Sequence, residues 1–99
     1  MTRVLYAGLD VSLEMTSICI VDAEGVMILE AKAVSDPADI GEVLAGVDGT
    51  FERIGLEAGP LSQWLYNGLT SAGLPAVCIE PAIFVEWVSA ASLTAGRWA

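Results

Sequence analysis

The sequence predicts one small α/β domain, built on a mixed five-stranded sheet with flanking helices. Residues 4–12, 16–22 and 26–34 are apolar runs of strand length, separated by short polar connections. Two later apolar runs, 51–58 and 75–79, alternate with segments of helical periodicity. The chain has 99 residues, of which 55% are hydrophobic and 17% charged, so it can form one packed domain.

The first three runs predict an antiparallel meander. Residues 4–12 are almost continuously apolar, which is typical of a central strand covered on both faces. The strand over 16–22 leads through Ala23-Glu24-Gly25 into the strand over 26–34. Connections this short join neighbouring antiparallel strands.

A helix is predicted to follow the meander. Asp36 is a good N-cap, and Pro37 suits the first helical position, where its missing N–H costs nothing. Asp48-Gly49 ends the helix. One apolar stripe is formed by Ile40, Val43, Leu44 and Val47.

The second half of the sequence predicts two further strands on either side of a second helix. The strand over 51–58 is followed by a helix that Gly59-Pro60 opens and Gly73 stops, and then by the strand over 75–79. The order is β-β-β-α-β-α-β, and the later strands should be parallel with right-handed crossovers. The apolar face of the second helix is predicted to hold Leu61, Trp64, Leu65, Gly68, Leu69 and Ala72.

Composition restricts the possible functions. The formal net charge is −9 and only four residues are Lys or Arg, which argues against nonspecific nucleic-acid binding by this segment alone. With no histidine, zinc sites and histidine-based catalysis are excluded. Cys19 and Cys78 lie in apolar runs, and we expect two buried thiols rather than a disulfide.

The sequence predicts a cytoplasmic protein. Met1-Thr2-Arg3 leads straight into a strand, which is unlike a signal peptide. No apolar run reaches the roughly 18 residues that a membrane span needs.

Two acids end apolar strands and form the candidate site. Asp10 ends the first strand and Glu57 the fourth. If these strands pair, both carboxylates face one crevice at the carboxyl end of the sheet. Such oxygen ligands suit Mg²⁺ or Mn²⁺, and two such ions about 4 Å apart can cleave a phosphodiester. The alternative is that both are surface acids at strand ends. Glu80 is a possible third ligand.

The ordered set of motifs resembles a known family. Residues 6–12, 16–22, 54–65 and 74–81 are similar to the start of the DEDD-type transposases of the insertion sequence one-hundred-and-ten family. The resemblance implies a RuvC-like domain of the ribonuclease H fold, with a magnesium site of four acids in the order Asp, Glu, Asp, Asp. The first two map to Asp10 and Glu57. Full-length relatives add a catalytic-serine domain and act on DNA in transposition and recombination, directed by an RNA.

The resemblance ends at Pro81. The family continues with a basic helix and an Asp pair, whereas no Asp follows Asp48 here. We therefore divide the chain into an incomplete RuvC-like nuclease domain, 1–81, and a divergent tail, 82–99, whose apolar spacing permits a helix. A frameshift near codon 81 is one hypothesis, which the genomic DNA downstream tests. We expect weak metal binding and little or no catalysis by this chain alone.

Two alternatives stay open at this point. The chain could be a non-catalytic interaction module or remnant, a homo-oligomer or a companion of an intact transposase, with Trp87 and Trp98 forming an apolar surface. It could also be a fragment of an actin-like ATPase, since that class begins with an apolar strand, Gly-x-Asp and a hairpin. Val11, Leu13 and Glu14 stand where that class has small hydroxylated residues.

Overall fold

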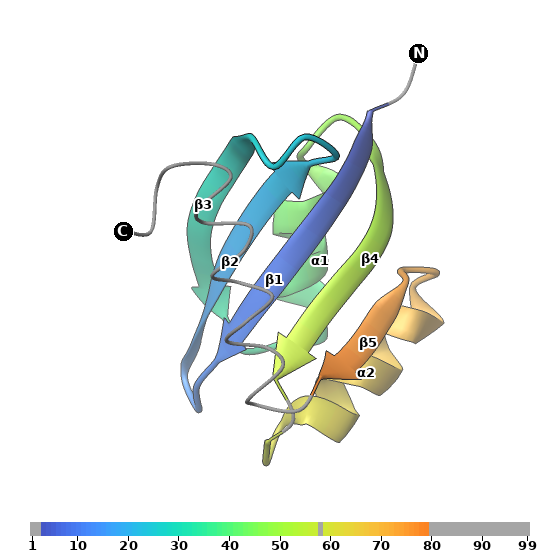
Figure 1. Ribbon diagram of the computed structural model, residues 1–99. Coiled ribbons are helices and arrows are strands. Elements are labelled where there is room, and N and C mark those ends of the chain that lie inside the picture. Colours follow the sequence, from blue (N-terminus) through green and yellow to red (C-terminus); the bar gives the residue numbers. More distant parts are fainter. Residues whose placement is uncertain (1–2, 58, 80–99) are drawn as a thin grey trace.

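The computed structural model describes residues 3–57 and 59–79, and its elements follow the predicted order (Figure 1). The possible helix in 82–99 lies outside the described residues. No helix of the described ranges combines the length and the apolar character needed to cross a bilayer. The elements are β1 (Val4–Val11), β2 (Met15–Asp22), β3 (Met27–Val34), α1 (Pro37–Ala45), β4 (Thr50–Glu57), α2 (Ser62–Ser71) and β5 (Ala76–Ile79).

The five strands form one mixed sheet in the order β3-β2-β1-β4-β5. β1 pairs antiparallel with β2, and β2 antiparallel with β3, which confirms the meander. β4 is parallel to both β1 and β5, as the alternation of strands and helices predicted. Both crossovers run in the same direction across the sheet, so α1 and α2 lie side by side on one face and contact each other (Figure 1).

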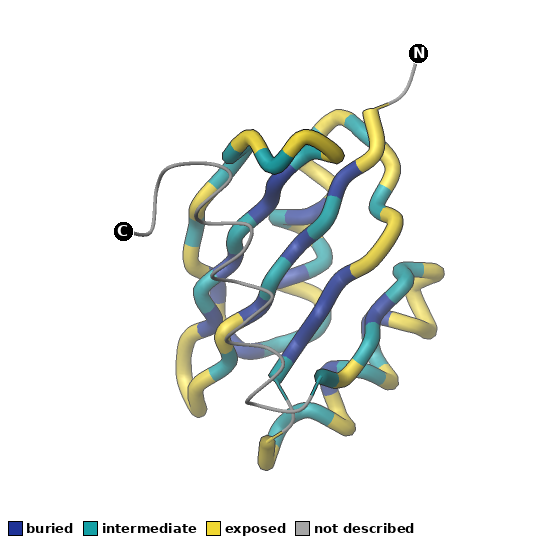
Figure 2. Tube along the Cα trace, viewed as in Figure 1, coloured by how far each residue is buried: buried dark blue, intermediate teal, exposed yellow. Residues whose placement is uncertain are grey.

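The hydrophobic core lies between the sheet and the two helices (Figure 2). Alternate strand residues point toward the helices, and the central strands supply most of the fully buried side chains. Burial of each large apolar side chain contributes roughly 1.5–3 kcal/mol. The largest buried apolar side chains are Leu5, Leu9, Ile18, Ile20, Ile40, Leu44, Ile54, Leu56, Leu65 and Leu69.

The start of α1 matches its prediction, and its end comes earlier. The Asp36 carboxylate accepts a hydrogen bond from the Ala38 N–H at 2.8 Å, and Pro37 is the first helical residue. The helix ends at Ala45, where the Gly46 N–H bonds back to the last turn, so Val47 lies beyond it. Gly49 has φ +152°, and a Cβ there would lie 2.6 Å from a Leu5 methyl, which favours glycine at the entry to β4.

Two side-chain predictions are wrong. Trp64 was expected on the apolar face of the second helix, but it is 50% exposed, and the fully buried residues of α2 are Leu65 and Leu69. Cys78 was expected to be buried, but it is exposed, and Cys19 is half-buried. Cys78 lies on β5, a short edge strand with a neighbour on one side only, where fewer elements surround each side chain.

Close contact between the helices predicts the effect of a Gly68 substitution. A Cβ at Gly68 would overlap the Pro37 ring, so Gly68→Ala must push α1 and α2 apart. We expect the free energy of unfolding to fall by about 1–3 kcal/mol, as overpacking usually costs. Urea denaturation followed by circular dichroism measures this change.

Gly41→Ala is the matched control. A Cβ at Gly41 meets no heavy atom within 4 Å, and helical alanine is favoured over glycine by about 0.5–1 kcal/mol. This variant should therefore be at least as stable as the wild type. Equal effects at both positions would contradict the helix contact described above.

Candidate functional site

Asp10 and Glu57 lie on adjacent parallel strands at the same end of the sheet. In the register of β1 with β4, Leu9 is opposite Leu56, and each acid is the next residue of its strand. Neighbouring strands are about 4.8 Å apart. The pairing of these strands, which the sequence analysis stated as a condition, therefore brings the backbone positions of the two acids to neighbouring strands.

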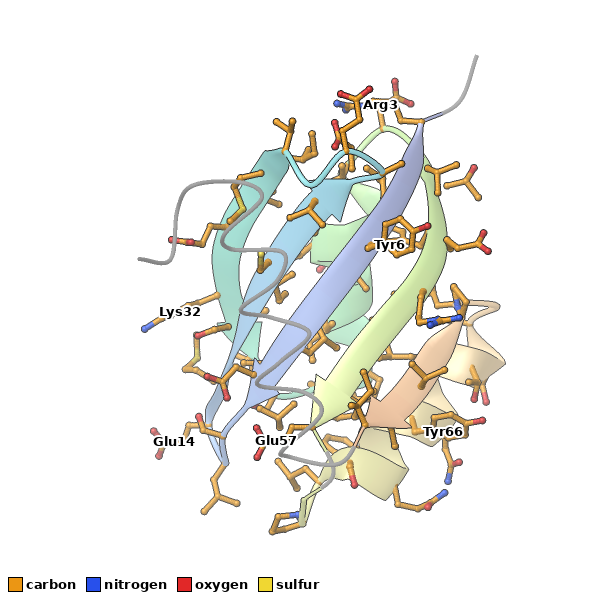
Figure 3. The ribbon with its side chains drawn as sticks, viewed as in Figure 1. Arg3, Tyr6, Glu14, Lys32, Glu57 and Tyr66 are labelled. Atoms are coloured by element: carbon orange, nitrogen blue, oxygen red, sulfur yellow. The ribbon has the colours of Figure 1, made fainter. Side chains whose placement is uncertain are left out.

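Both acids belong to the sheet face that α1 and α2 do not cover. Leu9 and Leu56 are fully buried under the helices, and successive strand residues point to opposite faces. Asp10 is exposed and Glu57 half-buried, and Glu57 lies at the carboxyl end of β4, close to the end of β1 (Figure 3). The acids are therefore open to solvent rather than enclosed in the core.

The strand registers give the neighbours of the acid pair across this face. Two positions before the acids, on the same face of the sheet, β1 and β4 both have a glycine. The backbone beside the acids therefore carries no side chains there. Glycine in a strand interior often marks a close approach of another group. Asp10 lies opposite Ser17, which lies opposite Lys32, and Glu57 lies opposite Ile79. Two positions earlier on the same face, one row holds Glu30, Cys19, Gly8, Gly55 and Val77.

The described residues place no compensating positive charge in contact with the pair. Within the described part of the chain, no lysine or arginine forms an ion pair with Asp10 or Glu57. Lys32 is two strands away from Asp10, about 10 Å, where salt screens the interaction at physiological ionic strength. Two like charges side by side on neighbouring strands are destabilising. A bound cation would remove this cost.

The number of acids limits which metal site the described chain can form. In residues 3–57 and 59–79, no three His, Cys, Asp or Glu side chains lie together as a metal group. Glu80, the possible third ligand, lies outside the described residues. Mg²⁺ is nevertheless commonly held by one or two carboxylates, with waters and substrate phosphates completing its octahedron. Asp10 and Glu57 match that minimal arrangement.

A pocket of about 400 Å³ opens beside Glu57. It lies between the β1–β2 hairpin and the turn that leads into α2, at the carboxyl ends of β1 and β4, where ligands bind in open α/β sheets. Among the described residues, Glu57 is the acid in its lining, and Asp10 is outside it. The pocket is lined by Val11, Ser12, Leu13, Glu57, Gly59, Pro60, Leu61 and Ser62.

Buried hydroxyl groups fix the hairpin that follows Asp10. The Ser35 and Thr16 hydroxyls are hydrogen-bonded at 2.8 Å, and the Ser35 hydroxyl donates to the Ser12 carbonyl at 2.6 Å. The Ser35 N–H donates to the Glu14 carbonyl at 2.9 Å. Ser35, which follows β3, is therefore hydrogen-bonded to both sides of the hairpin loop that follows β1.

The sequence reasoning did not identify Ser35 and Thr16 as supports of the site. They are buried, and they meet across 19 positions of the chain, so no local pattern reveals their contact. Ser12 was expected to be a turn residue, and its hydroxyl does donate to the Met15 carbonyl across the turn. Asp22 was also expected in a turn, and its carboxylate accepts from the Glu24 and Val26 N–H groups.

Comparisons with known proteins identify no relative of this chain. No protein-family model matches it, and no curated protein matches it. Functional conclusions therefore depend on the residues and on their arrangement in the sheet.

The hydroxyl network predicts that Ser35→Ala destabilises the protein. The substitution leaves the Thr16 hydroxyl without its buried partner and removes one anchor of the hairpin. The free energy of unfolding should fall by about 1–3 kcal/mol, the usual cost of an unsatisfied buried polar group. Thermal and urea denaturation measure the loss.

Ser71→Ala is the control, because Ser71 is exposed at the end of α2 and should change stability by less than about 0.5 kcal/mol. If Ser35→Ala were as neutral as the control, the hairpin would not depend on this network.

Proposed function

We propose that this chain is the amino-terminal part of a RuvC-like transposase nuclease domain of the ribonuclease H type. The proposed activity of the complete protein is metal-dependent phosphodiester cleavage in DNA transposition and recombination. Its partners are DNA and the guide RNA that the family resemblance implies. Asp10 and Glu57 are proposed as the first two metal ligands of that site.

The observation that carries this proposal is the parallel pairing of β1 with β4. A fourth strand that paired elsewhere would separate the two acids by the width of at least one more strand. The register that pairs Leu9 with Leu56, the residues just before the two acids, supports the proposal. The strand order β3-β2-β1-β4-β5, with an antiparallel β2, also agrees with the ribonuclease H-like fold proposed here.

The proposed chemistry assigns a simple task to each acid. Asp10 and Glu57 would bind one Mg²⁺ or Mn²⁺ on the uncovered face, and the oxygens of a DNA phosphate would complete the coordination. A divalent ion held in this way polarises the phosphate and lowers the pKa of a bound water. A two-ion mechanism needs further ligands beyond these two carboxylates. We therefore expect this chain alone to hold one ion weakly and to be inactive.

Metal binding by the acid pair is tested by thermal stability. In metal-free buffer, Asp10→Asn and Glu57→Gln should be at least as stable as the wild type, because each removes the repulsion between like charges. Added Mn²⁺ should stabilise the wild type, by about 1.4 kcal/mol when the ion is at ten times its Kd, but neither Asp10→Asn nor Glu57→Gln. Differential scanning fluorimetry across a Mn²⁺ titration measures both effects.

Glu24→Gln is the matched control, since Glu24 is an exposed acid in the β2–β3 turn, and it should respond to Mn²⁺ like the wild type. An equal response in Asp10→Asn and Glu57→Gln would exclude the acid pair as the binding site. If ATP stabilised the chain and Mn²⁺ alone did not, the actin-like ATPase alternative would be favoured.

Nuclease assays test the expected inactivity. The chain alone should leave supercoiled and branched DNA intact in Mg²⁺ or Mn²⁺, because two carboxylates supply too few ligands for a two-ion site. Gel electrophoresis of the DNA products measures cleavage. Mn²⁺-dependent cleavage that disappears in Asp10→Ala would contradict this expectation and would show that the pair suffices.

A further inference from the structure

The edge strand β3 offers a long backbone surface for strand pairing. It has eight residues and is paired with β2 on one side, and it is the outermost strand of the sheet. The opposite edge strand, β5, has only four residues. Edge strands present N–H and C=O groups that can pair with another strand. Among the strands of residues 3–57 and 59–79, β3 is therefore the longer edge of the sheet.

Opposite charges lie symmetrically about the centre of this edge. Glu30 is opposite Cys19 and Lys32 is opposite Ser17, so both charged residues belong to the sheet face away from the helices. Ala31, between them, points to the helix side, opposite the buried Ile18. Glu30 and Lys32 are exposed, and the Lys32 side chain extends outward from β3 (Figure 3).

We propose that β3 is a self-association surface that pairs antiparallel with β3 of a second copy of this chain. The two-fold axis passes at Ala31, which lies opposite its own counterpart. Glu30 then lies opposite Lys32 of the second copy, and Lys32 opposite Glu30 of the second copy. Two ion pairs form on one face, and the two five-stranded sheets become one continuous sheet.

Charge selects this register among the neighbouring ones. Centring the contact on Glu30 would place two glutamates opposite each other, and centring it on Lys32 would place two lysines opposite each other. Like charges directly opposite on paired strands are destabilising, whereas opposite charges are favourable. Because the two-fold axis is perpendicular to the sheet, both copies also keep their helices on the same side. A second copy is therefore the occupant that this edge fits.

The charges of Glu30 and Lys32 have a second explanation, which the experiment must distinguish from dimerisation. Charged side chains on edge strands, lysine above all, commonly prevent association between sheets. A purely protective lysine would leave the chain monomeric, and replacing it would not weaken any dimer. The ion-pair arrangement predicts the reverse, together with rescue when the two charges are exchanged.

Sedimentation equilibrium of the full chain tests the proposal. The wild type should show a concentration-dependent monomer–dimer equilibrium. Lys32→Glu and Glu30→Lys should each raise the dimer Kd by about tenfold or more, because two attractive pairs become two repulsive ones. Circular dichroism verifies that each variant keeps the fold.

Charge exchange supplies the decisive controls. The double variant Glu30→Lys/Lys32→Glu should recover the wild-type Kd, since each new lysine again lies opposite a glutamate. An equimolar mixture of the two single variants should form a heterodimer more tightly than either variant self-associates. Neither result is expected if the substitutions act only by disturbing the fold.

The proposal depends on the β3 edge alone and not on the acid pair. Asp10→Asn should leave the dimer Kd unchanged, so failure of the metal site and failure of the dimer are separate outcomes. A wild type that stays monomeric up to millimolar concentration would overturn the proposal. So would a dimer whose Kd is the same in the wild type and in both single variants, because another surface would then carry it.

Discussion

The parallel pairing of β1 with β4 is the constraint on which the rest of this structure depends. It joins the meander to the βα half of the domain and makes β1 the central strand, paired on both sides. The alternation along the paired strands buries Leu9 and Leu56 under the helices. The same alternation leaves the next residues, Asp10 and Glu57, on the open face. Core packing and the candidate site are thus two consequences of one register.

The acid pair is the feature on which the proposed function depends. Within residues 3–57 and 59–79, neither carboxylate forms an ion pair with a lysine or arginine. The chain supports this end of β1 with the buried hydroxyls of Thr16 and Ser35. A proposed ligand site needs such support, because ligand side chains must be held in position by their surroundings. A bound divalent ion would turn the repulsion into coordination.

Local sequence patterns were sufficient to predict the order of the elements but not the burial of every side chain. Apolar runs of strand length and the Asp36–Pro37 cap have local physical causes, and the structure agrees with them. Burial of Trp64 and Cys78 depends on how far α2 and β5 are covered by other elements, which no local pattern encodes. The pairing that joins Asp10 to Glu57 could be stated only as a condition, because strand neighbours are a tertiary property. The metal itself stays a prediction.

Paramagnetic NMR with substoichiometric Mn²⁺ tests the central claim most directly, because the ion broadens amide signals according to their distance from it. Our account predicts that the signals of Asp10, Val11, Leu56 and Glu57 broaden together, before those of the acidic β2–β3 turn, and that EDTA restores them. Broadening at the end of only one of the two strands, or first at the turn, would contradict a cation shared by the two carboxylates.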